Sequence, residues 1–207
     1  MPPPTPCLIL VFARAPIAGR CKTRLIPKLG AQGAAQVHRE LVLKTLHTAL
    51  AVTEARVELW CAPDTQHGFF YACRRRHGVR LQRQRAGDLG AKMSHAIAHA
   101  LRRARSVIVI GTDCAVLSAD DLRAALNALT THDTVLQAAE DGGYVLIGAR
   151  RWSTRALANI RWSSGQELGQ TRRHLHRFGL SAAERPPLWD VDQPADVVRA
   201  RRLTLIS

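Results

Sequence analysis

A carboxylate, Asp113, follows the most apolar short run of the chain. Residues 107–110 are four consecutive valines and isoleucines, which is typical of a strand buried on both faces of a parallel sheet. Gly111 ends the run, so Thr112 and Asp113 emerge at the carboxyl end of this strand, where open α/β sheets bind ligands. Near phosphates, such a carboxylate would coordinate Mg²⁺ or Mn²⁺, hard cations that prefer oxygen ligands. The alternative is an aspartate in an ordinary turn after a strand.

A basic loop follows the first predicted strand, residues 8–12. It carries four basic side chains: Arg14, Arg20, Lys22 and Arg24. Phosphate oxygens need several charged donors and a close backbone approach, and a loop of this composition around Gly19 offers both. The Walker A and Gly-x-Gly-x-x-Gly patterns are absent. The loop is therefore a candidate phosphate site, with an arginine-rich surface loop as an equal alternative when it is taken alone.

Two further acidic motifs could complete a site. Asp190 and Asp192 share one face if the backbone is extended, so either could be a second metal ligand, although a solvated turn before Pro194 explains them as well. The segment Asp141-Gly-Gly-Tyr144 lies between two apolar runs, and Asp-Gly is a strong hairpin signal. Its two glycines would also admit a substrate to the backbone, with Asp141 as acceptor or base. Spacing alone leaves these alternatives open.

The elements that must position these residues alternate along the chain. Strands are predicted at residues 8–12, 56–61, 79–82, 107–110, 134–138 and 144–147. Helices are predicted at residues 31–51, 66–77, 89–105 and 194–203, after a capping box at 118–121, and in an arginine-rich region beyond residue 150. This alternation predicts an α/β fold, a single-domain three-layer α/β/α sandwich with a mostly parallel sheet. Residues 1–6 are expected to be a disordered lead-in, and residues 7–207 the domain.

Composition restricts the class of protein. The chain has 207 residues, 30 Lys and Arg against 16 Asp and Glu, and a formal net charge of +14, which fits a basic surface or an anionic ligand. Aromatic residues are 5% and do not alternate with a basic stripe, so a nucleic-acid partner is disfavoured. The five cysteines form no Cys-x-x-Cys pair, which argues against a disulfide framework or a zinc site and favours a cytoplasmic location. The chain start lacks the charged region of a signal peptide, and no segment approaches membrane-spanning length, so no membrane partner is expected.

Several stretches, in order along the chain, resemble one family. They are Ala13–Leu25, Gly87–Met93, Ile110–Cys114, Asp141–Gly148, Ile160–Trp162 and Asp190–Asp192. On these stretches the chain resembles the DUF2064 group, bacterial proteins similar to nucleotide-diphospho-sugar transferases of the glycosyltransferase-A fold. Some members are described as arsenosugar-type glycosyltransferases, and the group is also similar to the 2-phospho-L-lactate guanylyltransferases of deazaflavin synthesis.

The resemblance implies roles for individual residues. Lys22 and Arg24 would face the nucleotide phosphates, and Asp113 would hold the metal with Asp192 as its partner. The implied nucleoside pocket comprises Asp88, Gly90 and Lys92, and the implied acceptor side comprises Asp141, Gly142, Gly143, Tyr144 and Trp162. Ala115 and the run Gln137–Ala139 stand where the family pattern has prolines, and this departure is expected to loosen two loops at the site.

Together these features predict a metal-dependent transferase that uses a nucleotide-sugar donor, a small-molecule acceptor and Mg²⁺ or Mn²⁺. Asp141 would assist the acceptor as a base, and Lys22 would stabilise the departing phosphates. One alternative is a nucleotidyltransferase that uses a nucleoside triphosphate and releases pyrophosphate. An alternative from another class is a non-catalytic basic module that binds nucleic acid, with tight and strongly salt-dependent affinity for any duplex.

Overall fold

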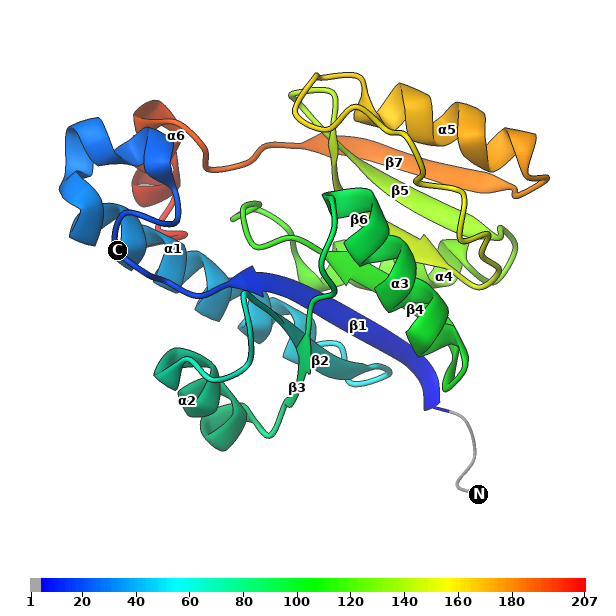
Figure 1. Ribbon diagram of the computed structural model, residues 1–207, viewed down its shortest axis with the longest axis horizontal. Helices are drawn as coiled ribbons and strands as arrows, with labels where there is room; N and C mark the ends of the chain where they lie inside the picture. Colours follow the sequence, from blue (N-terminus) through cyan, green and yellow to red (C-terminus); the bar gives the residue numbers. More distant parts are fainter. Residues whose placement is uncertain (1–4) are drawn as a thin grey trace.

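The computed structural model describes residues 5–207 and is built on a seven-stranded sheet with the order β3-β2-β1-β4-β6-β5-β7 (Figure 1). The strands are β1 (Thr5–Arg14), β2 (Arg56–Ala62), β3 (Arg80–Arg83), β4 (Ala104–Ile110), β5 (Thr134–Ala139), β6 (Tyr144–Ala149) and β7 (Ala182–Leu188). Strand β6 pairs antiparallel with β4 and β5, and the four other pairings are parallel. The predicted mostly parallel sheet is therefore confirmed.

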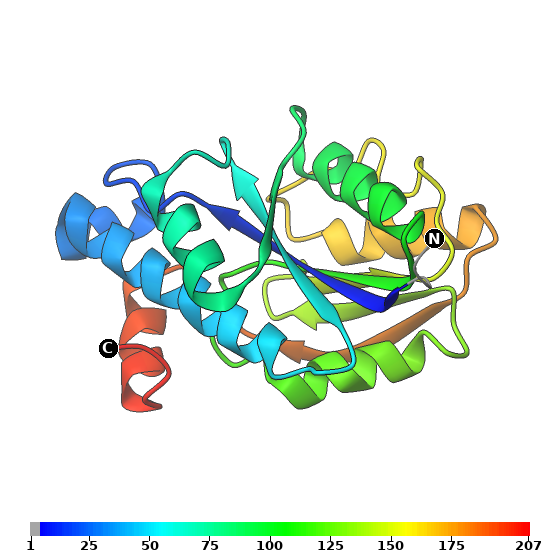
Figure 2. The same ribbon diagram turned by 90° about the horizontal axis from the view of Figure 1, so that it is seen from below.

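Helices cover both faces of the sheet. They are the 3-10 turn η1 (Thr23–Leu25) and the helices α1 (Ile26–Leu50), α2 (Gly68–His77), α3 (Leu89–Leu101), α4 (Ala119–Ala128), α5 (Glu167–Arg177) and α6 (Pro194–Arg202). Figure 2 shows α3 and α5 on one side of the sheet and α1 and α4 on the other. This arrangement confirms the three-layer α/β/α sandwich.

The alternation of side chains along β1 explains the two cores. Ile9 and Val11 pack with apolar residues of α1, α2 and α4, whereas Leu8 and Leu10 pack with those of α3. Because successive side chains of a strand point to opposite faces, a strand that is apolar throughout must be covered on both sides. Strand β4 follows the same rule, and its Ile110 is fully buried next to the exposed Gly111. The central strands therefore end abruptly at one polar edge.

Several element boundaries differ from the prediction. Strand β7 was not predicted: its sequence Ala-Ala-Glu-Arg-Pro-Pro-Leu has no apolar alternation, and it pairs with β5 alone as an edge strand, where proline is tolerated. Helix α1 begins at Ile26 rather than residue 31, across a kink at Gly30, and α3 ends at Leu101 because β4 begins three residues later. In the arginine-rich region beyond residue 150, the helix is confined to α5. Residues 1–4 of the expected lead-in lie outside the described residues, and strand β1 begins at Thr5.

The C-terminal segment returns to the edge where the central strands end. Helix α6 packs against the first half of α1, with Val197 and Ala200 buried beside Val37 and Leu41 (Figure 1). The chain between β7 and α6 therefore crosses the carboxyl ends of the strands. Within residues 5–207, no helix combines the length and the apolar character needed to cross a membrane.

Candidate active site

A large cleft opens at the carboxyl ends of β1 and β4, with a volume of about 940 Å³. It is lined by the loop after β1, the start of α3, the loop after β4, the turn between β5 and β6, and residues 163–167 and 190–192. The cleft brings together nine of the predicted site residues: Arg14, Arg20, Lys22, Arg24, Lys92, Asp113, Asp141, Tyr144 and Asp192. Arg14 and Asp192, 178 positions apart in the sequence, therefore share one cavity.

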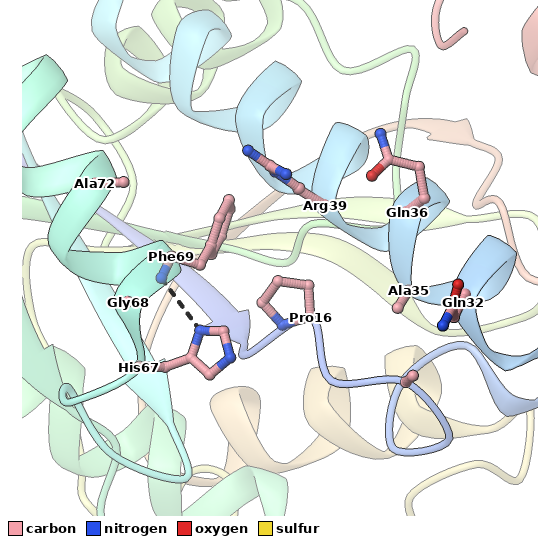
Figure 3. Close-up of a pocket in the computed structure, with 10 residues that line it drawn as sticks. Pro16, Gln32, Ala35, Gln36, Arg39, His67, Gly68, Phe69 and Ala72 are labelled. Carbon is pink, nitrogen blue, oxygen red and sulfur yellow. Dashed lines mark hydrogen bonds between the residues drawn. The ribbon is translucent and has the colours of Figure 1, made fainter.

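A second hollow, of about 500 Å³, lies between α1 and α2 (Figure 3). Its charged side chain is Arg39, which lies over the Phe69 ring with its guanidinium carbon 5.8 Å from the ring centre. His67 caps α2, its Nδ1 accepting a hydrogen bond from the amide of Phe69 at 3.2 Å, as Figure 3 shows. Among the described residues, no carboxylate and one formally charged side chain line this hollow. The larger cleft, with its opposed charges, is therefore the candidate active site.

The ammonium of Lys22 lies at the centre of the large cleft's polar groups. Its Nζ is 2.7 Å from Oδ1 of Asp113 and 2.9 Å from Oδ1 of Asp192, and it donates a hydrogen bond to the carbonyl oxygen of Val191 at 2.7 Å. The Lys22 side chain is only 6% exposed, whereas the two carboxylate side chains are 47% and 38% exposed. The ammonium therefore has three oxygen partners, one for each of its N–H groups.

Backbone geometry explains this convergence. The amide of Val191 donates to the carbonyl oxygen of Asp113 at 2.8 Å, which fixes the 190–192 segment against the end of β4. Lys22 has left-handed backbone angles, φ 46° and ψ 45°, a region that few non-glycine residues adopt. This conformation stands immediately before η1, and the Lys22 side chain lies in the protein rather than in solvent. Tertiary contacts, not local preference, place Lys22 here.

The charged side chains around Lys22 shift one another's pKa values. Burial alone would lower the pKa of Lys22, but the carboxylates of Asp113 and Asp192 outweigh it and raise that pKa above its ordinary value, so Lys22 is charged. Burial, together with repulsion from Asp113 and Asp192, raises the pKa of Asp190 to about 7. Oδ1 of Asp190 is buried without a hydrogen-bond partner among the described residues. The acidic cluster therefore carries more negative charge than one lysine neutralises.

The arginines of the loop after β1 face solvent at the cleft wall. Arg24 reaches Oδ2 of Asp192 at 3.3 Å with a side chain that is 63% exposed, and Arg14 and Arg20 are also exposed. His38 was not predicted: it is buried in α1, and its Nε2 lies 3.0 Å from the carbonyl oxygen of Arg14. Because a carbonyl only accepts, Nε2 must carry the proton, and burial lowers the pKa of His38, which favours this neutral form. His38 thus anchors the start of the basic loop.

The predicted nucleoside side divides into lining and supporting residues. Leu89 and Lys92 line the cleft, and Leu89 is exposed there. Asp88 is the N-cap of α3, with Oδ1 accepting a hydrogen bond from the amide of Ala91 at 2.7 Å. Gly90 is buried, and a Cβ there would lie 2.9 Å from the ring of Trp162. Asp88 and Gly90 therefore support the cleft wall rather than line it.

The predicted acceptor side also divides into lining and non-lining residues. Asp141 and Tyr144 line the cleft, and Oδ1 of Asp141 accepts the amide of Gly143 at 3.0 Å. Gly142 has φ +89°, and a Cβ there would lie 2.1 Å from the carbonyl oxygen of Gly165. Gly142, Gly143 and Trp162 are not among the lining residues. The turn between β5 and β6 is thus a hairpin in which close contact with Gly165 leaves no room for a side chain at Gly142.

Sequence reasoning also missed lining residues on loops without a motif. Ser163, Gly165 and Glu167 line the cleft, and Glu167 is buried, with Oε1 accepting a hydrogen bond from the amide of Ser164 at 2.7 Å. Gln84, beyond β3, donates from Nε2 to the carbonyl oxygen of Trp60 at 2.8 Å. For Ser163, Gly165 and Glu167 the only signal was the break in helical pattern around residues 162–165, and Gln84 had none.

The positions that depart from the family pattern are well packed. Ala115 and Ala139 are buried. Gln137 is also buried and joins β5 to β7, donating to the carbonyl oxygen of Pro186 and accepting from Nε of Arg185 at 2.9 Å. The sequence predicted that losing prolines here loosens two loops, but the structure places buried contacts at these positions.

The oxygen ligands at the centre of the cleft match a hard divalent ion. Over residues 5–207, no three His, Cys, Asp or Glu side chains gather as a metal site would. Asp113, Asp192 and the carbonyl of Val191 nevertheless direct three oxygens at one point, and Mg²⁺ and Mn²⁺ prefer oxygen ligands and keep several waters. The donor set therefore fits such an ion, at a point that the Lys22 ammonium holds.

Comparison with solved structures defines the structural class. A protein from Desulfovibrio desulfuricans G20, provisionally described as a nucleotide-diphospho-sugar transferase, is 28% identical, with a TM-score of 0.83 over 90% of this chain and 82% of that one. CMP:2-keto-3-deoxy-manno-octonic acid synthetase in complex with CTP is 14% identical, with a TM-score of 0.61 over 96% and 98% of the two chains. Rv0371C from Mycobacterium tuberculosis H37Rv in complex with manganese is 19% identical, with a TM-score of 0.57 over 94% and 97%. The fold is that of the nucleotide-diphospho-sugar transferases.

Sequence comparison gives the family. The chain belongs to the DUF2064 family, described as an uncharacterized protein conserved in bacteria, whose model matches residues 45–164. Four of the stretches that carry the resemblance lie inside this range, while the basic loop and the 190–192 segment lie outside it. No curated protein sequence matches the chain.

Proposed function

We propose that the protein is a divalent-metal-dependent transferase that moves a glycosyl group from a nucleotide-sugar to a small hydroxyl-bearing acceptor. The observation that carries the proposal is the meeting, in one cleft at the strand ends, of a basic loop and the paired carboxylates of Asp113 and Asp192. The provisional description of the Desulfovibrio protein and the manganese complex of the Mycobacterium protein agree with it.

The residues of the cleft have distinct tasks in this reaction. Asp113 and Asp192 would hold Mg²⁺ or Mn²⁺, which when bound neutralises charge on the departing diphosphate. Arg20 and Arg24 line the same wall and would donate charged hydrogen bonds to phosphate oxygens. Asp141 faces the cleft with one oxygen held by the amide of Gly143, so its carboxylate is oriented to accept the acceptor's hydroxyl proton.

A second candidate is nucleotidyl transfer from a nucleoside triphosphate, with release of pyrophosphate. The CTP complex of the synthetase with the same fold favours this reaction. So does the number of basic side chains that line the cleft: Arg14, Arg20, Lys22, Arg24 and Lys92. A triphosphate carries more negative charge than a nucleotide-sugar, so it would use more of these bases. In this reaction the acceptor would be the attacking anion or hydroxyl, and the product a nucleotide conjugate.

A thermal-shift panel tests both candidates. The protein would be scanned with nucleotides, nucleoside triphosphates and nucleotide-sugars, each with Mg²⁺, with Mn²⁺ and with EDTA. A ligand at 100 times its Kd stabilises the fold by about 2.7 kcal/mol, a shift of several degrees. Arg20→Gln should reduce the shift, whereas Arg56→Gln, an exposed residue at the start of β2 and outside the cleft, should leave it unchanged.

The products then separate the two reactions. Phosphorus NMR of the turnover mixture should show a nucleoside diphosphate for glycosyl transfer and pyrophosphate for nucleotidyl transfer. Absence of stabilisation by every nucleotide, with or without metal, would refute the proposed function. Metal-independent binding to any DNA duplex, with a steep salt dependence, would instead indicate a nucleic-acid module.

A further inference from the structure

The ammonium of Lys22 has the surroundings of a bound cation. Its three contacts, to Asp113, Asp192 and the carbonyl of Val191, are all to oxygen and all between 2.7 and 2.9 Å. The Lys22 side chain is 6% exposed, so its ammonium is largely withdrawn from water. An ammonium donates three hydrogen bonds and accepts none, and here its capacity is filled.

The same oxygens are the set that fits a divalent ion, so two cations are directed to one point. An ammonium is no metal ligand at this charge, because its nitrogen has no free electron pair. Two positive charges a few ångströms apart in a partly buried site repel strongly. The ammonium and the metal ion therefore exclude each other.

The ammonium of Lys22 and a divalent ion can exchange at this point, because they reach the carboxylates from different directions. Lys22 enters from the protein side, with a buried stem, whereas the side chains of Asp113 and Asp192 are 47% and 38% exposed toward the cleft. A hydrated ion can reach the carboxylates from the cleft without unfolding the chain. Lys22 belongs to the basic loop that lines the same cleft, so a displaced ammonium stays near the place proposed for the donor phosphates.

We propose that Lys22 is an internal cation that occupies the metal position of the metal-free protein and is expelled when a divalent ion binds. The inference rests on the proposed function, since it concerns the metal of that site, and it adds a coupling. The expelled ammonium becomes a donor for phosphate, so metal binding prepares the cleft for the nucleotide, and each ligand increases the affinity for the other.

Lysine modification tests the displacement in the unaltered protein. The chain has only four lysines, Lys22, Lys28, Lys44 and Lys92, so each can be followed by mass spectrometry during acetylation with acetic anhydride. Without metal, the buried Lys22 should react slowest. Saturating Mg²⁺, in the absence of nucleotide, should increase its rate at least tenfold, while Lys28 and Lys44, which lie outside the cleft, change less than twofold. Continued protection of Lys22 at saturating Mg²⁺ would overturn the proposal.

Metal affinity gives an independent test. Mn²⁺ binding would be measured by the electron paramagnetic resonance signal of the free ion for the parent, Lys22→Met and Arg24→Met. Methionine keeps an unbranched stem without the charge, so Lys22→Met should bind Mn²⁺ at least tenfold more tightly than the parent. Arg24 also contacts Asp192, but through Oδ2 and with a 63% exposed side chain, so Arg24→Met should change the affinity by less than about threefold.

The outcomes separate this inference from the proposed function. Equal or weaker Mn²⁺ binding by Lys22→Met, with the parent binding Mn²⁺ and nucleotide, would refute the exchange and leave the transferase proposal standing. Tighter binding by Lys22→Met with no nucleotide binding by the parent would support the exchange and refute the transferase. If neither form binds Mn²⁺, the oxygen set is not a metal site and the exchange is refuted. Circular dichroism establishes that Lys22→Met is folded, and the acetylation test needs no variant.

Discussion

Replacing Asp190 by asparagine should stabilise the metal-free protein, and the gain should depend on pH. The parent carboxyl is held among like charges, with Oδ1 buried and unpartnered among the described residues, and burial with the charges of Asp113 and Asp192 raises its pKa from 3.8 to about 7. Asparagine keeps the shape of the side chain and removes the ionisable group. The substitution therefore relieves repulsion without creating a cavity.

The size of the stability gain expected for Asp190→Asn follows from proton linkage. Below pH 3.8 the carboxyl is protonated in both the folded and the unfolded chain, so it adds no pH dependence. Between pH 4 and about 7 the unfolded chain loses this proton while the folded chain keeps it, so the parent loses stability as the pH rises. A difference of about three pKa units corresponds to at most about 4 kcal/mol. Adjustment of the surroundings reduces this, and we expect about 2 kcal/mol, or roughly 4–8 °C in Tm.

The assay is thermal and urea unfolding of the parent and Asp190→Asn at intervals from pH 4 to pH 8, with EDTA present. The two proteins should be nearly equal in stability at pH 4, and the advantage of the variant should grow to a plateau above pH 7. Asp120→Asn is the matched control, because the Asp120 side chain is 91% exposed and pairs with Arg123 on the surface of α4. A constant difference across the pH range, or a variant that loses its advantage as the pH rises, would refute the reasoning.

Three further outcomes follow from the same geometry. Gly142→Ala should lower the free energy of unfolding by more than about 2 kcal/mol in urea titrations, because Gly142 has φ +89° and an added Cβ would lie 2.1 Å from a backbone oxygen. Gly143→Ala should cost less, because the atom nearest to its added Cβ is a side-chain atom at 3.2 Å. Asp113→Asn and Asp192→Asn should each weaken Mn²⁺ binding at least tenfold in calorimetry, and additive losses in the double variant would show that they do not share one ion. Glu58→Gln should destabilise by about 1.5–3 kcal/mol in the same urea assay, because the 4% exposed Glu58 carboxylate accepts a charged hydrogen bond from the partly exposed Arg103 at 2.8 Å; a cost below about 0.5 kcal/mol would argue against that pair.

Much of the secondary structure was predictable because short stretches of sequence determine it. Four consecutive apolar residues define β4 without knowledge of its neighbours, and Asp113 follows at the carboxyl end as expected. The capping box of α4 is formed by Ser118 and Asp121 as the sequence predicts, with the Ser118 amide 3.0 Å from Oδ2 of Asp121. Hydrogen bonds between residues three or four positions apart, and the periodicity of strands and helices, are encoded in short windows of sequence.

The fold class was predictable for a related reason. Alternating strands and helices with fully apolar central strands require a sheet covered on both faces, and this requirement does not depend on the details of any loop. Strand β7 escaped prediction because it lies at the edge of the sheet. With one neighbour and a largely exposed surface, it needs neither apolar alternation nor a full set of backbone donors, so Pro186 and Pro187 are tolerated.

The side-chain arrangement of the site was decided by the tertiary structure alone. The sequence indicates that Lys22 is a base in a loop, and from this one expects it to face phosphates. Its actual partners, Asp113 and Asp192, are 91 and 170 residues away. The ion pairs form because the hydrogen bond from the Val191 amide to the Asp113 carbonyl oxygen brings the two carboxylates to one point. Likewise, nothing near Gly142 in sequence indicates that Gly165 will lie against it. Contacts of this range depend on the whole folded chain, because they exist only after the sheet, α1 and α6 have packed together.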